Sequence, residues 1–221
     1  MQGDERKTLL IARYNETLPV KWCFVNAVKE IMIGSFDKCE VFSGNLALVR
    51  MGKLYGYVNR YGNIVIPPKF STAQSFHEGY ATVAVEKEPN STLYGVIDTS
   101  GTFVVMPNYA WLGTPSEGRV PYQTQKKGLT VFGYLNMKGE VVIEAQYTQV
   151  SRFNDGLAAV RMEDKEGYIN IDGEIIIPIK YNRARMFKNG SAFVSIGKNK
   201  SALINTKGEI LWGPYKQKDC Y

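Results

Sequence analysis

Side chains that commonly carry catalysis are scarce in this chain, which has one histidine and three cysteines among 221 residues. Acid–base and nucleophilic catalysis need a base within hydrogen-bond reach of a nucleophile. The single histidine, His77, lies in the segment FHEG at 76–79, which is typical of a tight turn, where residues are selected for backbone conformation. We therefore expect His77 to be a polar turn residue and not a catalytic base.

Acidic residues are the second candidate for chemistry, because a pair of carboxylates can hydrolyse a glycosidic bond. Glu163, Asp164 and Glu166 cluster beside Lys165. A solvated loop between repeats explains this cluster, and a loop tip does not supply the burial that a catalytic pair needs. The sequence also has no GxxxxGK[ST] phosphate-binding loop. We expect a protein that is not an enzyme and that uses no cofactor.

The cysteines do not indicate a metal site or a disulfide framework. Cys23, Cys39 and Cys220 are far apart, and no pair has the CxxC spacing that zinc sites favour. No stretch approaches the roughly 20 apolar residues of a membrane span, and Met1–Leu10 lacks the basic and apolar regions of a signal peptide. We expect a cytoplasmic protein, unless a signal peptide precedes this sequence in the native chain.

The composition is typical of a folded protein rich in β-strands. Apolar residues make up 44% and charged residues 22%, and there are 14 tyrosines and 10 phenylalanines, residue types that favour strands. The formal net charge of +6 favours contact with an anionic partner, but no run of five basic residues occurs. This distribution of charge argues against nucleic acid as the partner.

One sequence pattern recurs along most of the chain. It consists of an aromatic residue and glycine, two apolar residues, Asn or Asp, two variable residues, a turn glycine, an apolar triplet after one further residue, and a second aromatic residue. Copies begin at Tyr55, Tyr94, Phe132 and Glu166. The turn glycines are 34 to 39 residues apart, at Gly62, Gly101, Gly139, Gly173 and Gly208.

A second block follows each copy and keeps the same spacing. Examples are FHEGYATVAV from Phe76 and FNDGLAAVR from Phe153. Weaker copies lie at both ends, from Trp22 and from Leu203, as is typical of terminal capping repeats. The sequence therefore predicts five units and a partial sixth over residues 20–212, with an N-terminal extension at 1–19 and a C-terminal tail at 213–221.

Each unit is predicted to open with a β-hairpin. An Asn or Asp side chain accepts backbone hydrogen bonds within a turn, and glycine tolerates the positive φ of a bulged hairpin. The apolar triplets favour a central, buried strand, and the second block adds a third short strand. The predicted fold class is all-β, with tandem repeats of about 35 residues that form a curved array or a propeller-like ring. A four-stranded, propeller-like arrangement requires that the segment between the two aromatic positions also be extended.

These motifs resemble the bacterial WG repeat, also called the KWG repeat. The resemblance rests on the aromatic-Gly dipeptide, the N-x-x-G turn, the apolar triplet and the F-x-x-G-L-A-x-V block, and it covers nearly all of residues 20–212. It implies a binding or cell-surface-associated module. Where the family has Trp, this chain has Tyr55, Tyr94, Phe132 and Glu166. Glu166 is the largest departure, because it is not aromatic.

Recognition is the function that this organisation favours. In repeat proteins, the positions that differ between units are free to contact a partner, and here they lie between the two aromatic positions of each unit. These segments hold residue types that are rich in binding hot spots, Trp111, Arg152, Arg183 and Arg185. We expect them to bind another protein with an acidic surface, in an inhibitor or immunity type of interaction.

Two alternatives stay open on the sequence alone. The first is a carbohydrate or cell-wall binding module, since repeated exposed tyrosines can stack on the sugar rings of a polysaccharide. It requires exposure of the tyrosines in the aromatic-Gly strands, Tyr55, Tyr57, Tyr94, Tyr134 and Tyr168. The second is an enzyme, which requires a deep pocket with two or more convergent titratable groups.

Overall fold

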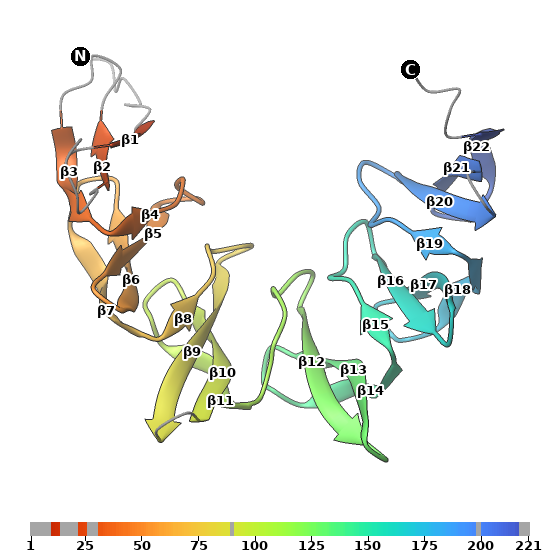
Figure 1. The fold of residues 1–221 in the computed structure, drawn as a ribbon, viewed down its shortest axis with the longest axis horizontal. Helices are drawn as coiled ribbons and strands as arrows, with labels where there is room; N and C mark the ends of the chain where they lie inside the picture. The colour runs from red at the N-terminus through yellow and green to blue at the C-terminus, as the bar shows by residue number, and fades with distance from the viewer. Residues whose placement is uncertain (1–9, 14–21, 26–30, 89–90, 198–199, 217–221) are drawn as a thin grey trace. The chain divides into compact units, whose positions relative to one another are not determined.

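The computed structural model describes residues 10–13, 22–25, 31–88, 91–197 and 200–216. These residues form strands, turns and irregular segments with no helix among them, which confirms the predicted all-β class. The strands make six sheets within the described part of the chain (Figure 1). The chain divides into two compact units, Met1–Asn108 and Tyr109–Tyr221.

The first unit holds three sheets, whose strand orders are β1-β2-β3, β4-β5-β6-β7 and β11-β10-β9-β8. The first sheet consists of β1 (Leu10–Arg13), β2 (Trp22–Val25) and β3 (Ile31–Phe36). The second consists of β4 (Lys38–Cys39), β5 (Leu46–Met51), β6 (Leu54–Asn59) and β7 (Ile64–Phe70). The third consists of β8 (Thr72–Ala73), β9 (Tyr80–Glu88), β10 (Ser91–Asp98) and β11 (Phe103–Tyr109).

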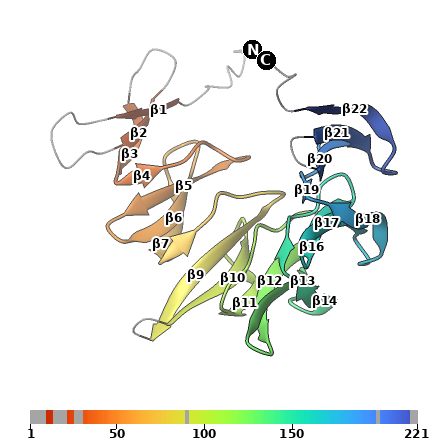
Figure 2. The ribbon, with the colours of Figure 1, turned by 45° about the vertical axis from the view of Figure 1, so that its right-hand side comes forward.

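The second unit also holds three sheets, ordered β12-β13-β14, β15-β16-β17-β18 and β19-β20-β21-β22. The first consists of β12 (Arg119–Lys126), β13 (Leu129–Asn136) and β14 (Val141–Tyr147). The second consists of β15 (Gln149–Val150), β16 (Leu157–Met162), β17 (Lys165–Asn170) and β18 (Ile175–Tyr181), of which the last three are labelled in Figure 2. The third consists of β19 (Arg183–Ala184), β20 (Ser191–Gly197), β21 (Lys200–Asn205) and β22 (Ile210–Lys216).

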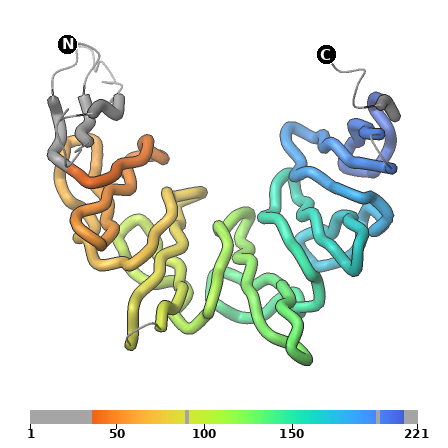
Figure 3. Tube along the Cα trace, in the orientation of Figure 1, coloured from red at the N-terminus to blue at the C-terminus, as the bar shows by residue number. Residues whose placement is uncertain are grey.

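The sheets are shifted by half a unit relative to the sequence repeats. The hairpin that opens one repeat, for example β17 and β18, pairs with β15 and β16, the strands that close the preceding repeat. The chain then passes from β18 to β19, the short first strand of the next sheet, along the path traced in Figure 3. The predicted hairpin and third strand are therefore confirmed. In four of the described sheets, the segment between the aromatic positions adds a two-residue fourth strand, as a propeller-like sheet requires. In the β12-β13-β14 sheet, this segment adds only the isolated bridge between Leu112 and Tyr122.

The hairpin turns have the predicted conformation, with φ between 82° and 89° at Gly62, Gly101, Gly139, Gly173 and Gly208. In one turn, Oδ1 of Asn170 accepts hydrogen bonds from the backbone N–H groups of Asp172 and Glu174, at 3.1 and 2.8 Å. The turn glycine also contacts the preceding sheet, because a Cβ on Gly173 would lie 3.3 Å from Cγ1 of Ile143. Both the backbone conformation and the available space therefore favour glycine here.

The prediction that the apolar triplets form central strands is wrong. The strands that carry them, β7, β11, β14, β18 and β22, each lie at the edge of their sheet. In β18, Ile175 and Ile176 are 54% and 43% exposed, whereas Ile177 is buried. Only the third residue of this triplet therefore faces the packed interior.

The glycine of the aromatic-Gly dipeptide is required by the close approach of two strands. A Cβ on Gly167 would lie 2.7 Å from the carbonyl oxygen of Ile177, and a Cβ on Gly56 would lie 2.5 Å from that of Ile66. The register between β17 and β18 shifts at this point, so the backbone of β18 occupies the space that a side chain would need. Glycine is therefore fixed here by packing against backbone.

Buried pairs of tyrosine and phenylalanine join successive sheets within each unit. The rings of Tyr168 and Phe187 are 4.7 Å apart, and the Tyr168 hydroxyl donates a hydrogen bond to the carbonyl oxygen of Arg185 at 2.7 Å. Tyr168 belongs to the β15–β18 sheet, whereas Phe187 lies between β19 and β20. The same contact recurs between Tyr57 and Phe76 and between Tyr134 and Phe153, at 4.7 and 4.8 Å.

The predicted ends of the repeat domain fall near strands. β1 lies within the predicted extension 1–19, and its Leu10 pairs with Val25 of β2. At the other end, β22 continues to Lys216, past the predicted start of the tail at residue 213. Residues 1–9, 14–21 and 217–221 lie outside the described part of the chain, so the boundaries 1–19, 20–212 and 213–221 stay predictions.

Candidate functional site

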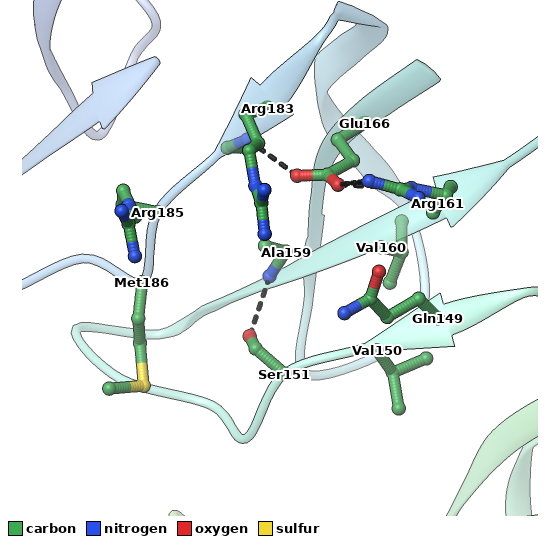
Figure 4. A pocket seen from close by; sticks show the side chains of 11 residues that line it. Gln149, Val150, Ser151, Ala159, Val160, Arg161, Glu166, Arg183, Arg185 and Met186 are labelled. Atoms are coloured by element: carbon green, nitrogen blue, oxygen red, sulfur yellow. Dashed lines mark hydrogen bonds and ion pairs between the residues drawn. The ribbon is translucent and has the colours of Figure 1, made fainter. Parts of the chain in front are cut away.

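The candidate site is a cavity of about 180 Å³ in the second unit, between the β15–β18 sheet and the segment around β19. It is lined by residues 149–151 and 159–161, by Glu166 and by residues 183–186, and we call it the Glu166 cavity (Figure 4). The lining includes the side chains of Arg161, Arg183 and Arg185. Three guanidinium groups against one carboxylate give the cavity a positive charge.

Glu166 is the buried charged group of this cavity, with 8% of its surface exposed. Its Oε1 accepts hydrogen bonds from Nε of Arg161 at 3.0 Å and from the Nη2 of the same guanidinium. Its Oε2 accepts a hydrogen bond from the backbone N–H of Ala184, at 2.5 Å. A buried charge is tolerated when it is paired and hydrogen-bonded, and Glu166 meets both conditions.

The burial of Glu166 corrects the prediction that the acidic cluster is a solvated loop. Glu163 and Asp164 do lie exposed in the turn between β16 and β17, with a φ of 52° at Glu163. Glu166, in contrast, lies in β17 and faces Arg161 of β16 as its cross-strand partner. Glu166 therefore takes the position of the aromatic residue found in the other repeats and replaces an apolar contact by an ion pair.

Arg183 and Arg185 lie two residues apart on the segment around β19, and both are exposed. Their backbone is held by β20, since Arg183 pairs with Ser195 and the N–H of Arg185 donates to the carbonyl oxygen of Phe193 at 2.8 Å. Among the described residues, neither guanidinium has an ion pair or a side-chain hydrogen bond. The backbone at these two positions is therefore held by β20, and both guanidinium groups are available to an anionic partner.

The structure brings together only two of the four predicted binding residues at this cavity. Trp111 lies in the same unit, but it is half-buried and packs edge-on against Phe132, with ring centroids 5.6 Å apart. Arg152 is half-buried as well and is not part of the cavity lining. Arg183 and Arg185 line the cavity, together with Arg161, which the sequence reasoning missed. The signal for Arg161 was its place five residues before a glutamate that occupies an aromatic position.

The tyrosines that the carbohydrate hypothesis requires are not exposed. Tyr57, Tyr134 and Tyr168 are fully buried, and Tyr55 and Tyr94 are half-buried. Burial raises the pKa of the hydroxyls of Tyr57, Tyr134 and Tyr168 above the usual value. These residues hold the sheets together, and the carbohydrate hypothesis loses its main support.

His77 lies in a turn, as predicted, and forms an isolated bridge with Tyr80. Its Nδ1 is 3.7 Å from Oε1 of Glu78, and it belongs to the first unit, whereas the Glu166 cavity belongs to the second. Within the described residues, no group of three His, Cys, Asp or Glu side chains is suited to hold a metal ion. The described part of the chain also holds no helix long and apolar enough to cross a membrane.

The fold and the site define a tandem-repeat, all-β protein. Each of its complete sheets combines the opening hairpin of one repeat with strands that close the preceding repeat. A family model described as a WG containing repeat matches residues 22–55, 55–87, 94–127, 132–165 and 167–199. The chain belongs to this WG repeat family. The first match confirms that the weaker copy beginning at Trp22 is a genuine repeat.

Comparison with other known proteins gives fewer matches in sequence than in structure. No curated protein sequence matches the chain. Among solved structures, BamB from Moraxella catarrhalis is similar at 12% identity and a TM-score of 0.45, over 96% of this chain and 75% of that protein. The WD40 β-propeller domain of Doa1 is similar at 11% identity and a TM-score of 0.39, over 87% of this chain and 74% of that domain.

Proposed function

We propose that this protein is a non-catalytic interaction module that binds another protein through the exposed arginines of the Glu166 cavity. The single observation that carries this proposal is the pair Arg183 and Arg185, which is exposed, held by β20 and unpaired among the described residues. Arginine is enriched in binding hot spots because its planar guanidinium forms several directed hydrogen bonds. The partner presents an acidic surface to this face.

An inhibitor or immunity type of interaction fits this proposal best. Such a module needs a rigid framework and one exposed cluster that recognises its target. The buried Tyr–Phe pairs supply the framework, and the residues between the aromatic positions vary freely around it. A carbohydrate-binding module is not favoured, because the tyrosines it would use are buried or half-buried.

The test is a pulldown from the source organism with the full chain as bait, followed by mass spectrometry, beside a sedimentation assay with peptidoglycan and polysaccharide. We expect one protein to be recovered in stoichiometric amount. The double variant Arg183→Ala/Arg185→Ala should weaken its binding by about 1 to 4 kcal/mol and leave the melting temperature nearly unchanged. Affinity for the recovered protein should also fall as salt rises, because the contact is electrostatic.

The matched control is Lys138→Ala/Lys207→Ala, which removes the same number of positive charges from exposed hairpin turns of the same unit. This control should retain the partner. An equal loss of binding in the arginine variant and the control would show that net charge alone attracts the partner. Full binding by the arginine variant would show that Arg183 and Arg185 lie outside the contact, and either result would make the proposed site wrong. Sedimentation with polysaccharide in place of protein recovery would favour the alternative, a carbohydrate-binding module, over protein binding.

A further inference from the structure

The Glu166 cavity already contains one carboxylate bound by a guanidinium, and this contact indicates what else the cavity accepts. Glu166 receives two N–H groups of Arg161 on one side and a backbone N–H on the other. Arg183 and Arg185 line the same cavity without an acceptor among the described residues (Figure 4). One carboxylate of the chain thus lies on one side of the cavity, and two guanidinium groups lie in its lining without a carboxylate of the described residues.

We propose that the Glu166 cavity receives the carboxylate of a single Asp or Glu side chain of the protein partner. This inference rests on the proposed function and names the group that the arginines recognise. Arg183 and Arg185 donate to the incoming carboxylate, and Glu166 keeps Arg161 out of the contact by neutralising it. Guanidinium and carboxylate match in planar geometry and in charge.

The size of the cavity favours a side chain over a larger ligand. A volume of about 180 Å³ lies below the roughly 300 to 1,000 Å³ of pockets that hold whole small molecules. Each water takes up about 30 Å³ in the liquid, so the cavity has room for one carboxylate side chain and a few waters. Met186, which is 39% exposed and belongs to the lining, offers an apolar contact to the stem of that side chain.

The chemistry of the lining favours a carboxylate over a phosphate. Phosphate sites commonly use several backbone N–H groups that point at the anion. Two backbone N–H groups of this lining are already engaged, because Ala184 donates to Glu166 and Ala159 donates to Oγ of Ser151 at 2.9 Å. The side chains of Arg183 and Arg185 therefore carry recognition, as is typical of contacts with an acidic residue.

The test is a titration of the full chain, labelled with ¹⁵N-arginine, followed through the Nε–H signals of its arginines by NMR. The probes are glutamate blocked at both backbone ends, the equally blocked glutamine, and inorganic phosphate. We expect blocked glutamate to shift the signals of Arg183 and Arg185 saturably, while blocked glutamine leaves them in place. Phosphate should bind more weakly than blocked glutamate.

The variant Glu166→Gln gives a result that a merely structural role would not produce. Without the carboxylate, Arg161 becomes a third donor for the ligand, so blocked glutamate should bind severalfold more tightly even though the melting temperature falls. Arg183→Ala should weaken the same binding on the order of tenfold. The Lys138→Ala/Lys207→Ala control should match the unmodified chain.

Each other outcome overturns the inference in a distinct way. Equal shifts with blocked glutamine would show that the cavity does not select a carboxylate. Phosphate binding as tight as that of glutamate would make it a general anion site. A pulldown partner that needs Arg183 and Arg185 but is not competed by blocked glutamate would leave the proposed function intact and remove only this inference.

Discussion

Two junctions between successive sheets are built from the same repeat, and one of the cross-strand pairs at which they differ exchanges an aromatic residue for a carboxylate. At the junction after β4–β7, Arg50 faces Tyr55, whereas at the junction after β15–β18, Arg161 faces Glu166. Tyr55 packs against the apolar core of its unit, and the Nε of Arg50 is buried without a hydrogen-bond partner among the described residues. Arg161, in contrast, is paired with a carboxylate. The same position therefore serves packing in one unit and charge in the other.

The two junctions share one buried contact, and we expect this contact to contribute most to the stability of each. Each contains a buried tyrosine whose ring is 4.7 Å from a phenylalanine of the next sheet and whose hydroxyl donates to a backbone carbonyl oxygen at 2.7 Å. The Tyr–Phe pair is the same at both junctions although the residue facing Arg50 or Arg161 differs, so the Tyr–Phe pair is the structural part of the repeat. The aromatic residue of the family's dipeptide can be exchanged when the new side chain finds a partner across the hairpin.

The largest expected effect tests this division directly. Tyr168→Ala and Tyr57→Ala each remove a fully buried ring and its hydrogen bond. We expect each to lower the free energy of unfolding by about 3 to 5 kcal/mol, because a large cavity is left behind. Denaturant unfolding followed by tyrosine fluorescence measures both. A loss of stability in only one of the two variants would show that the two Tyr–Phe pairs are not equivalent.

The next effect concerns the glycine that both junctions share. Gly167→Ala and Gly56→Ala would place a Cβ within 2.7 Å of backbone atoms of the neighbouring edge strand. We expect a loss of about 2 to 3 kcal/mol from each, since backbone cannot move as a flexible side chain does. Gly197→Ala is the control, because a Cβ there meets no atom of the described residues within 4 Å. Thermal unfolding of the three variants measures these losses of stability. A loss of similar size in Gly197→Ala would contradict the packing argument.

Much of this framework could be predicted from sequence, because it depends on local rules. The spacing of glycines and the Asn or Asp at each turn fix the hairpins, as the positive φ at Gly62 and Gly173 confirms. The edge position of the apolar triplets was missed, since an apolar run such as Ile175–Ile177 does not reveal how many neighbours its strand has. Glu166 was missed for a related reason. Its burial depends on Arg161 and on the N–H of Ala184, a residue of the next sheet.

An exchange of residues between the two junctions sharpens the comparison further. Glu166→Tyr copies the Arg50–Tyr55 pair of the first unit, and Tyr55→Glu copies the Arg161–Glu166 pair of the second. We expect Glu166→Tyr to cost only about 1 to 2 kcal/mol of stability, because a packed ring replaces the ion pair. It should nevertheless abolish partner binding, because the ring fills the cavity. Calorimetry and the pulldown measure the two effects separately.

The reciprocal variant Tyr55→Glu should remain folded, since its carboxylate gains Arg50 as a partner. Tyr55→Gln is the matched control, because it has a similar shape without the charge. Equal stability of these two variants would contradict the idea that an arginine before the dipeptide is what allows an acidic residue to enter it.

The smallest effect is a loss of stability at alkaline pH, which both junctions should share. Burial raises the pKa of the hydroxyls of Tyr57 and Tyr168 above their usual range, and an unfolded tyrosine ionises near pH 10. The folded protein therefore holds these protons more tightly than the unfolded chain does. The stability that they contribute is fully present below about pH 10 and is lost as pH rises further, by at most about 1.4 kcal/mol per pH unit for each tyrosine. Denaturant unfolding at pH 8 to 11 should show this decline, and Tyr57→Phe or Tyr168→Phe should each reduce its slope by a similar amount. An unchanged slope in one variant would mean that its tyrosine is open to solvent and that the two junctions differ in packing as well as in charge.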